Sequence, residues 1–301
     1  MNLDMYIYTD SFTHNGKDSD YDVIERLNKF TELTTKVGTN FRDDNRFYAN
    51  YNELNETKLF SDGTTFLDML YGNCSNNYEL NNTFLLILSS GYLESTELPA
   101  NKIDCLITNN TEDNCYAKVV LSKENAYSNG NCIVATYEDW LIYRSELLGK
   151  FPGTCSNFYQ ECERYYENLV ISKDLQSASK QVLETHSAQI CYILYCINTY
   201  MLTEFSKFKD SNIQFPHYFA KKYDIEDGSF EGNGKTKRKY LIMSFPEGEK
   251  TCEAHFKYNS INGVKKFNDV RDYCRVYFSI PKEGDTKIYI GAILNHTKQC
   301  N

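Results

Sequence analysis

The 301-residue chain has little of what marks secreted, membrane-spanning or linker-rich proteins. It holds only five prolines, no Gly/Ser tract and no run of 18 apolar residues, so we expect neither long linkers nor a membrane span. Its start, MNLDMYIYTD, lacks the basic and apolar stretches of a secretory signal. The eleven cysteines are scattered without a Cys-x-x-Cys pair, which is typical of reduced, mostly buried thiols. We therefore expect a cytoplasmic protein with no metal and no other cofactor.

Phosphate-binding glycine motifs are also missing. Neither GxGxxG nor GxxxxGK[ST] occurs, so the sequence does not support a nucleotide-triphosphate site. Apolar residues nevertheless make up 41% of the chain, which is enough to form cores and excludes wholesale disorder.

The first 152 residues predict a mixed α/β domain. Apolar runs at 5–8, 84–88, 105–107, 117–121 and 132–135 predict buried strands. Helical spacing predicts helices over 21–37, with Asp20 as N-cap, and over 137–148. The alternation of strands and helices indicates a Rossmann-like sheet, with polar loops at 38–60 and 72–82.

The rest of the chain divides into a helical connector, 153–214, and a sheet module, 215–301. The connector has predicted helices over 158–169, capped by Thr154 or Ser156, and over 174–207, where we expect His186 to be solvated or capped. A short helix at 217–223 precedes strands at 239–245, 251–258, 273–280 and 286–294. Their short turns predict an antiparallel meander packed on helices. The expected fold class is α+β.

Charge is unevenly distributed along the chain. The net charge is −9, yet residues 216–301 hold 15 basic and 11 acidic residues, against 17 and 30 in residues 1–215. This shift either reflects ordinary solvated surfaces or indicates that the basic C-terminal module meets a polyanion.

The chemistry-bearing residues of the C-terminal module follow a two-residue period. Strand alternation places one set on a common sheet face: Glu253, His255, Lys257, Arg275, Tyr277 and Ser279. His296 and Lys298 follow the last predicted strand, which carries Lys287 and Tyr289. The face is either a solvated surface of an α+β domain or a site.

If it is a site, its residue types favour RNA cleavage without metal. The module has no cluster of acidic residues at metal-ligand spacing, which disfavours two-metal nuclease chemistry. Two histidines can transfer protons to and from a reacting 2′-OH and 5′-oxygen, while Lys and Arg offset charge on the phosphorane. Tyr277 and Tyr289 can stack bases, and Lys287 and Lys298 can contact phosphates.

Short motifs in this module resemble a toxin superfamily. The segments Glu-Ala-His-Phe-Lys (253–257), Arg-Val-Tyr-Phe (275–278) and Lys-Ile-Tyr-Ile-Gly-Ala-Ile-Leu-Asn-His-Thr (287–297) resemble the C-terminal half of RelE/ParE-superfamily toxins. Residues 135–152, ATYEDWLIYRSELLGKFP, are similar to a segment of larger bacterial anti-phage-defence-associated proteins. The resemblance implies a RelE-like antiparallel sheet whose active positions correspond to His255, Lys257, Arg275 and His296.

The sequence and the resemblance together give one preferred hypothesis and several alternatives. We expect a bacterial toxin or anti-phage defence effector, an mRNA-interferase-type endoribonuclease that acts on RNA or the ribosome. Residues 1–152 would sense or dock, and a regulatory or defence-complex protein would be its partner. One alternative is a non-catalytic module that binds nucleic acid or a protein such as gyrase. Another is a structural subunit of a defence complex, and a metal-dependent DNA nuclease is the least favoured.

Overall fold

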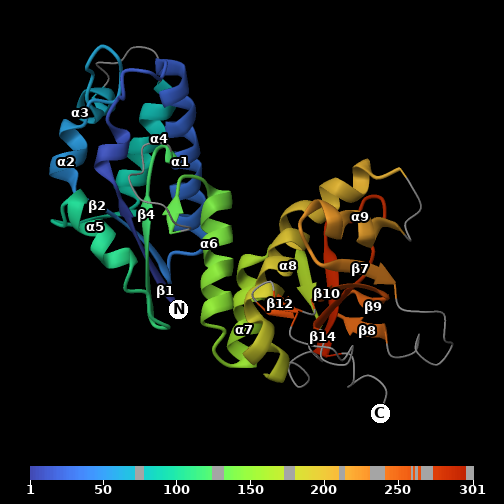
Figure 1. Cartoon of the computed structure of the whole chain (residues 1–301). Helices are drawn as coiled ribbons and strands as arrows, with labels where there is room; N and C mark the ends of the chain where they lie inside the picture. Colours follow the sequence, from blue (N-terminus) through green and yellow to red (C-terminus); the bar gives the residue numbers. More distant parts are fainter. Residues whose placement is uncertain are drawn as a thin grey trace. The chain divides into compact units, whose positions relative to one another are not determined.

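The computed structural model describes residues 1–71, 78–123, 132–172, 180–209, 214–230, 241–258, 260–261, 264–265 and 274–295. The chain forms two compact units, Met1–Tyr143 and Arg144–Asn301, and each contains its own five-stranded sheet (Figure 1). The expected mixture of helices and strands is confirmed. The division between the units falls inside helix α6 (Tyr137–Lys150). The three-part division at 152/153 and 214/215 stays a prediction.

The sheet of the first unit is entirely parallel, with the strand order β3-β2-β1-β4-β5. Its strands are β1 (Asn2–Ile7), β2 (Asn45–Ala49), β3 (Leu93–Ser95), β4 (Asn114–Val119) and β5 (Ile133–Val134). The chain moves from β1 to one edge, then returns to add β4 and β5 on the other side, as in doubly wound sheets. This order agrees with the Rossmann-like sheet predicted from the sequence.

Six helical segments of the first unit connect these strands before α6. They are the 3₁₀ helix Thr9–Phe12, α1 (Asp20–Asn40), α2 (Tyr51–Glu56), α3 (Phe66–Leu70), α4 (Tyr78–Ser89) and α5 (Ala100–Ile107). The N-cap of α1 is Ser19, which shares a capping box with Asp22, whereas the sequence predicted Asp20. Asp20 instead accepts hydrogen bonds from Ser61.

Two strands predicted in this unit are wrong. Residues 84–88 lie in α4, where Leu80, Phe84 and Ile87 are buried at helical spacing. Residues 105–107 end α5, which buries Ala100, Ile103 and Ile107 at the same kind of spacing. Short apolar runs do not distinguish a buried strand from a helix. Conversely, β2 and α2 lie within the stretch predicted to be a polar loop.

The sheet of the second unit has the order β6-β14-β13-β10-β7. Its strands are β6 (Leu169–Ile171), β7 (Asp227–Phe230), β10 (Ala254–Tyr258), β13 (Cys274–Phe278) and β14 (Ile288–Asn295). The antiparallel succession β10-β13-β14 confirms three strands of the predicted meander. The fourth, β8 (Ile242–Phe245), pairs instead with β9 (Gly248–Thr251) as a separate hairpin. A short hairpin of β11 (Ser260–Ile261) and β12 (Val264–Lys265) completes the strands.

Helices of the second unit cover one face of this sheet. They are α7 (Cys155–Tyr165), capped by Thr154 as predicted, α8 (Lys180–Lys207) and α9 (Phe215–Lys222). Phe219 of α9 stacks on Phe256 of β10, with ring centroids 5.5 Å apart. His186 marks a kink in α8 and is buried, so of the two expected states, solvated or capped, the solvated one is wrong. Burial lowers its pKa.

Candidate functional site

Six polar side chains share the face of the second sheet that lies opposite α9. The register places Lys257 between Arg275 and Asp227, and His255 between Tyr277 and Ser229. Residues directly opposite one another on antiparallel strands point to the same side. We call this the polar face: Asp227, Ser229, His255, Lys257, Arg275 and Tyr277. The predicted sharing of one face by the four residues of β10 and β13 is therefore confirmed.

Three of these side chains are not accessible, although the sequence led us to expect an accessible face. His255 is 1% exposed, Tyr277 is fully buried and Arg275 is 6% exposed. The rings of His255 and Tyr277 lie 4.8 Å apart, and Arg275 Nη1 donates a 3.1 Å hydrogen bond to the Tyr277 hydroxyl. His255 Nε2 lies 3.4 Å from Ser229 Oγ. These residues form a buried polar network.

A second layer, the β8–β9 hairpin, explains part of the burial of these side chains. Strand alternation fixes which face a side chain joins but not whether another element covers that face. The strand expected over 239–245 as part of the meander instead forms the β8–β9 hairpin, which packs over β14. A Cβ at Gly291 of β14 would lie 2.7 Å from Cys252 and 3.0 Å from Met243, which shows how closely this layer approaches.

The accessible part of the polar face lies at its β7 edge. Lys257 Nζ and Asp227 Oδ2 are 3.1 Å apart, and His217 Nδ1 of α9 lies 3.8 Å from Asp227 Oδ1. The side chains of His217, Asp227 and Lys257 are 73%, 44% and 23% exposed. We call these three residues the edge cluster. It offers an imidazole, a carboxylate and an ammonium to solvent.

Electrostatics favour the charged form of the cluster's carboxylate. Burial alone raises the pKa of Asp227, but the hydrogen bond and charge of Lys257, the Gly228 backbone N–H and the nearby His217 outweigh it. The net effect lowers the pKa of Asp227. An ionised Asp227 can orient the imidazole.

Sequence reasoning missed His217 as a site residue, because β7 was not predicted. Its position after Pro216 in a basic helix was the available signal, since Lys221 lies one turn later and is exposed. Residues four apart share a helix face. The geometry thus adds an exposed imidazole beside Lys257.

The other predicted residues that the structure describes, Lys287 and Tyr289, lie outside the polar face and the edge cluster. Lys287 is exposed and donates a hydrogen bond to the Glu167 carbonyl. Tyr289 is half-buried, with its ring against Phe245 and Lys250 Nζ 4.4 Å from the ring centroid. His296 and Lys298 lie outside the described residues.

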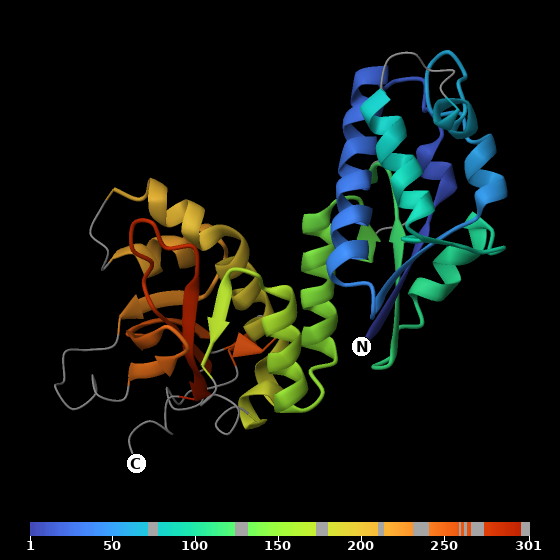
Figure 2. The same ribbon diagram turned by 180° about the vertical axis from the view of Figure 1, so that it is seen from behind.

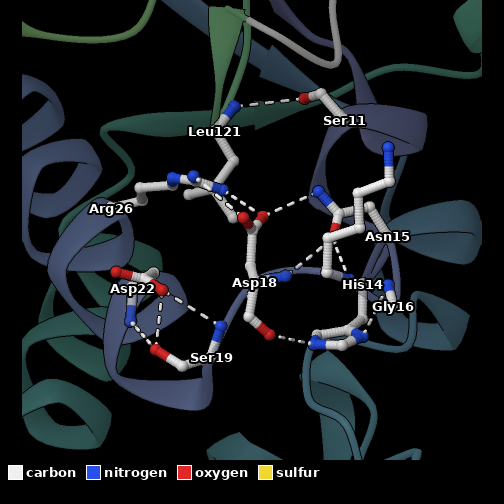
Figure 3. A network of polar contacts seen from close by, with 10 residues as sticks. Ser11, His14, Asn15, Gly16, Asp18, Ser19, Asp22, Arg26 and Leu121 are labelled. Carbon is white, nitrogen blue, oxygen red and sulfur yellow. Dashed lines mark hydrogen bonds and ion pairs between the residues drawn. The ribbon is translucent and has the colours of Figure 1, made fainter.

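Further polar groups lie in the segments that follow β1 and β4, at the carboxyl end of the first sheet, where open parallel sheets bind ligands. Ser11 Oγ accepts a 3.1 Å bond from the Leu121 backbone N–H and so ties β1 to β4 (Figure 3). Asp18 pairs with Arg26 and accepts from Asn15, and the His14 ring bonds the Asp18 carbonyl and the Gly16 N–H (Figure 3). These groups bond to one another, which is typical of a structural loop.

The described ranges contain neither a metal site nor a membrane-spanning helix. There, no three His, Cys, Asp or Glu side chains gather as a metal site, and no helix is long and apolar enough to cross a membrane. The nine described cysteines are free, and six of them are buried. No protein-family model, curated protein or solved structure matches the chain.

Proposed function

We propose that the second unit is the effector part of a bacterial toxin or anti-phage defence protein and cleaves RNA by metal-independent acid/base chemistry. The observation that carries the proposal is the edge cluster, in which one carboxylate lies 3.8 Å from His217 and 3.1 Å from Lys257. We also propose, as part of the same hypothesis, that the sheet is RelE-like.

The edge cluster supplies a general base, His217, and two charged groups, Asp227 and Lys257, that stabilise the charges formed in such a reaction. His217 takes the proton of a 2′-OH, and that oxygen attacks the adjacent phosphorus. Asp227 stabilises the imidazolium that forms, and Lys257 offsets the growing charge on the phosphorane. The bond from phosphorus to the 5′-oxygen then breaks, and the 5′-oxygen takes up a proton. The sequence analysis named His296 as a proton-transfer residue without fixing its role, and in this proposal it is the donor.

The buried network has a positioning role in this proposal. His255 and Arg275 do not reach a substrate in the described conformation, because they are 1% and 6% exposed. They instead fix β10 against β13, directly across from Tyr277 and Lys257. Lys221, exposed on the His217 face of α9, provides a contact for a neighbouring phosphate.

Burial of His255 and Arg275 favours a second candidate function. These are two of the positions that the toxin resemblance implies to be catalytic. A chain that keeps them buried fits a non-catalytic binding module or a structural subunit of a defence complex. RNA or a protein such as gyrase would then be bound without turnover.

Cleavage of a labelled RNA by the full-length protein in excess chelator distinguishes the two functions. We expect His217→Gln to slow cleavage about 100-fold or more, since a positioned proton-transfer group contributes at least this much. Lys257→Gln should slow cleavage, whereas Lys282→Gln, the same charge change in the exposed β13–β14 turn, should not. Binding without cleavage by the wild type would favour the non-catalytic module. Cleavage that is unchanged in His217→Gln would contradict the proposed site.

A further inference from the structure

One face of the first sheet is well covered by helices. Helix α1 contacts β2 and packs beside α4, and both lie in front of the sheet in Figure 2. Trp140 of α6 donates a 3.1 Å bond to the Asn45 side chain and stacks on Phe41. The strand residues pointing to this side, including Leu3, Met5 and Phe47, are buried.

Among the residues that the structure describes, the other face is covered over only part of its width. Helix α5 contacts β4, and its residues Ile103 and Ile107 pack with Tyr8, Val120 and Ile133 in a buried cluster. The part of this face on β1, β2 and β3, with one residue of β4, keeps exposed or half-buried side chains, of which Tyr6 and Tyr116 border the buried cluster. We call these residues the open face: Asp4, Tyr6, Arg46, Tyr48, Glu94 and Tyr116. Parallel sheets are normally covered on both faces, so an open one indicates a binding surface.

The open face combines aromatic rings with carboxylates. Tyr6 and Tyr48 are directly opposite each other, with ring centroids 5.0 Å apart and nearly parallel planes. Glu94 lies opposite Tyr48 on β3 and is exposed. Arg46 lies opposite Asp4 and hydrogen-bonds to Tyr48, and its charge acts on Asp4 more than on Glu94.

The covered part of the same face shows what such a combination binds. Lys118 of β4 is buried with its ammonium 3.9 Å from the centroid of the Tyr8 ring and 2.6 Å from Asp104 Oδ1. A tyrosine ring and a carboxylate together therefore hold a cation there. The open face repeats these groups in Tyr6, Tyr48 and Glu94.

The charge of the whole unit favours the same kind of partner. Residues 1–143 contain 22 acidic and 10 basic residues, so their field attracts cations and repels nucleic acid. Tyr and Arg are also enriched at protein interfaces. We propose that the open face docks a basic protein segment, whose Arg or Lys side chain lies on the Tyr6–Tyr48 pair and bonds to Glu94. This inference is independent of RNA cleavage, because it concerns the other unit.

Binding of a fluorescent octa-arginine peptide to the full-length protein tests this proposal, with octa-glutamate as the reverse-charge probe. Tyr48→Leu keeps the charge and should weaken octa-arginine binding about 5- to 10-fold, the range of a cation–π contact. Glu94→Gln should weaken it similarly. Glu32→Gln makes the same charge change on the exposed side of α1, which packs on the opposite face, and should leave binding within twofold.

Folding and self-association are controlled separately. Fluorescence of Trp140, the single tryptophan, confirms that each variant keeps the first unit folded, and Glu94→Gln tests the proposal if Tyr48→Leu unfolds. Equal octa-arginine affinities of the wild type, Glu94→Gln and Glu32→Gln would overturn the proposal in favour of nonspecific attraction. A dimer in light scattering that Glu94→Gln dissociates would overturn it in favour of a second copy of this chain.

Discussion

Removing one hydroxyl from the buried network should measurably destabilise the second unit. The Tyr277 hydroxyl accepts a 3.1 Å hydrogen bond from Arg275 Nη1, and both side chains are buried. Tyr277→Phe keeps the ring packing on His255 but takes one acceptor from a buried guanidinium. Hydrogen bonds to charged groups contribute about 1.5–3 kcal/mol, so we expect a loss of about 2 kcal/mol in the free energy of unfolding.

The position of the single tryptophan separates the two units in this assay. Trp140 belongs to the first unit, so its fluorescence in urea reports that unit, while far-UV circular dichroism reports both. Tyr277→Phe should shift the dichroism transition of the second unit to lower urea and leave the Trp140 transition in place. Hydrogen exchange of β13 would locate the loss.

A matched substitution on the neighbouring strand provides the control. Tyr289 lies half-buried on β14 and packs on Phe245 through its ring. Within the described residues its hydroxyl makes no hydrogen bond, so Tyr289→Phe should change stability by less than about 0.5 kcal/mol. Equal effects of the two substitutions would refute the reasoning that Arg275 depends on the Tyr277 hydroxyl.

Three further predictions test other parts of the fold. Burial lowers the pKa of His186, so as the pH falls the unfolded chain binds this proton before the folded chain does. The free energy of unfolding should therefore decrease as the pH falls below about 6.5. In urea melts at different pH values, His186→Gln should reduce this decrease. In Gly228→Ala the new Cβ would lie 2.2 Å from the Pro216 carbonyl oxygen. The free energy of unfolding, measured in dichroism melts, should therefore fall by about 2 kcal/mol or more. RNA cleavage should also be impaired, because α9 is displaced. Ser19→Ala removes the α1 cap and should lower stability by about 1 kcal/mol in the Trp140 fluorescence transition.

Local patterns in the sequence predicted elements whose signals are local. The spacing of apolar residues predicted α1 and α6, and alternation predicted the meander of β10, β13 and β14. Edge pairing was not predictable in this way. Strand β6 precedes α8 in the sequence and β14 follows it, yet the two strands pair in parallel. No residue near either strand in the sequence specifies this partner.

For the site, too, the sequence predicted only what local periodicity determines. Two-residue periodicity correctly placed His255, Lys257, Arg275 and Tyr277 on one face, because strand geometry requires it. Their burial depends in part on the β8–β9 hairpin, and strand alternation does not predict its packing over β14. The proximity of His217 to Lys257 depends on the packing of α9 against β7, which leaves no periodic signal.

The chemistry of the RNA ends tests the central claim most directly. A 2′-oxygen attack without metal leaves a 2′,3′-cyclic phosphate on one fragment and a 5′-OH on the other. Mass spectrometry of fragments made by the full-length protein in excess chelator should show these ends, and their formation should depend on His217. An RNA that carries a single 2′-deoxy substitution at the cleavage position should stay intact there. Fragments with 5′-phosphate ends, or no fragments at all, would contradict the account.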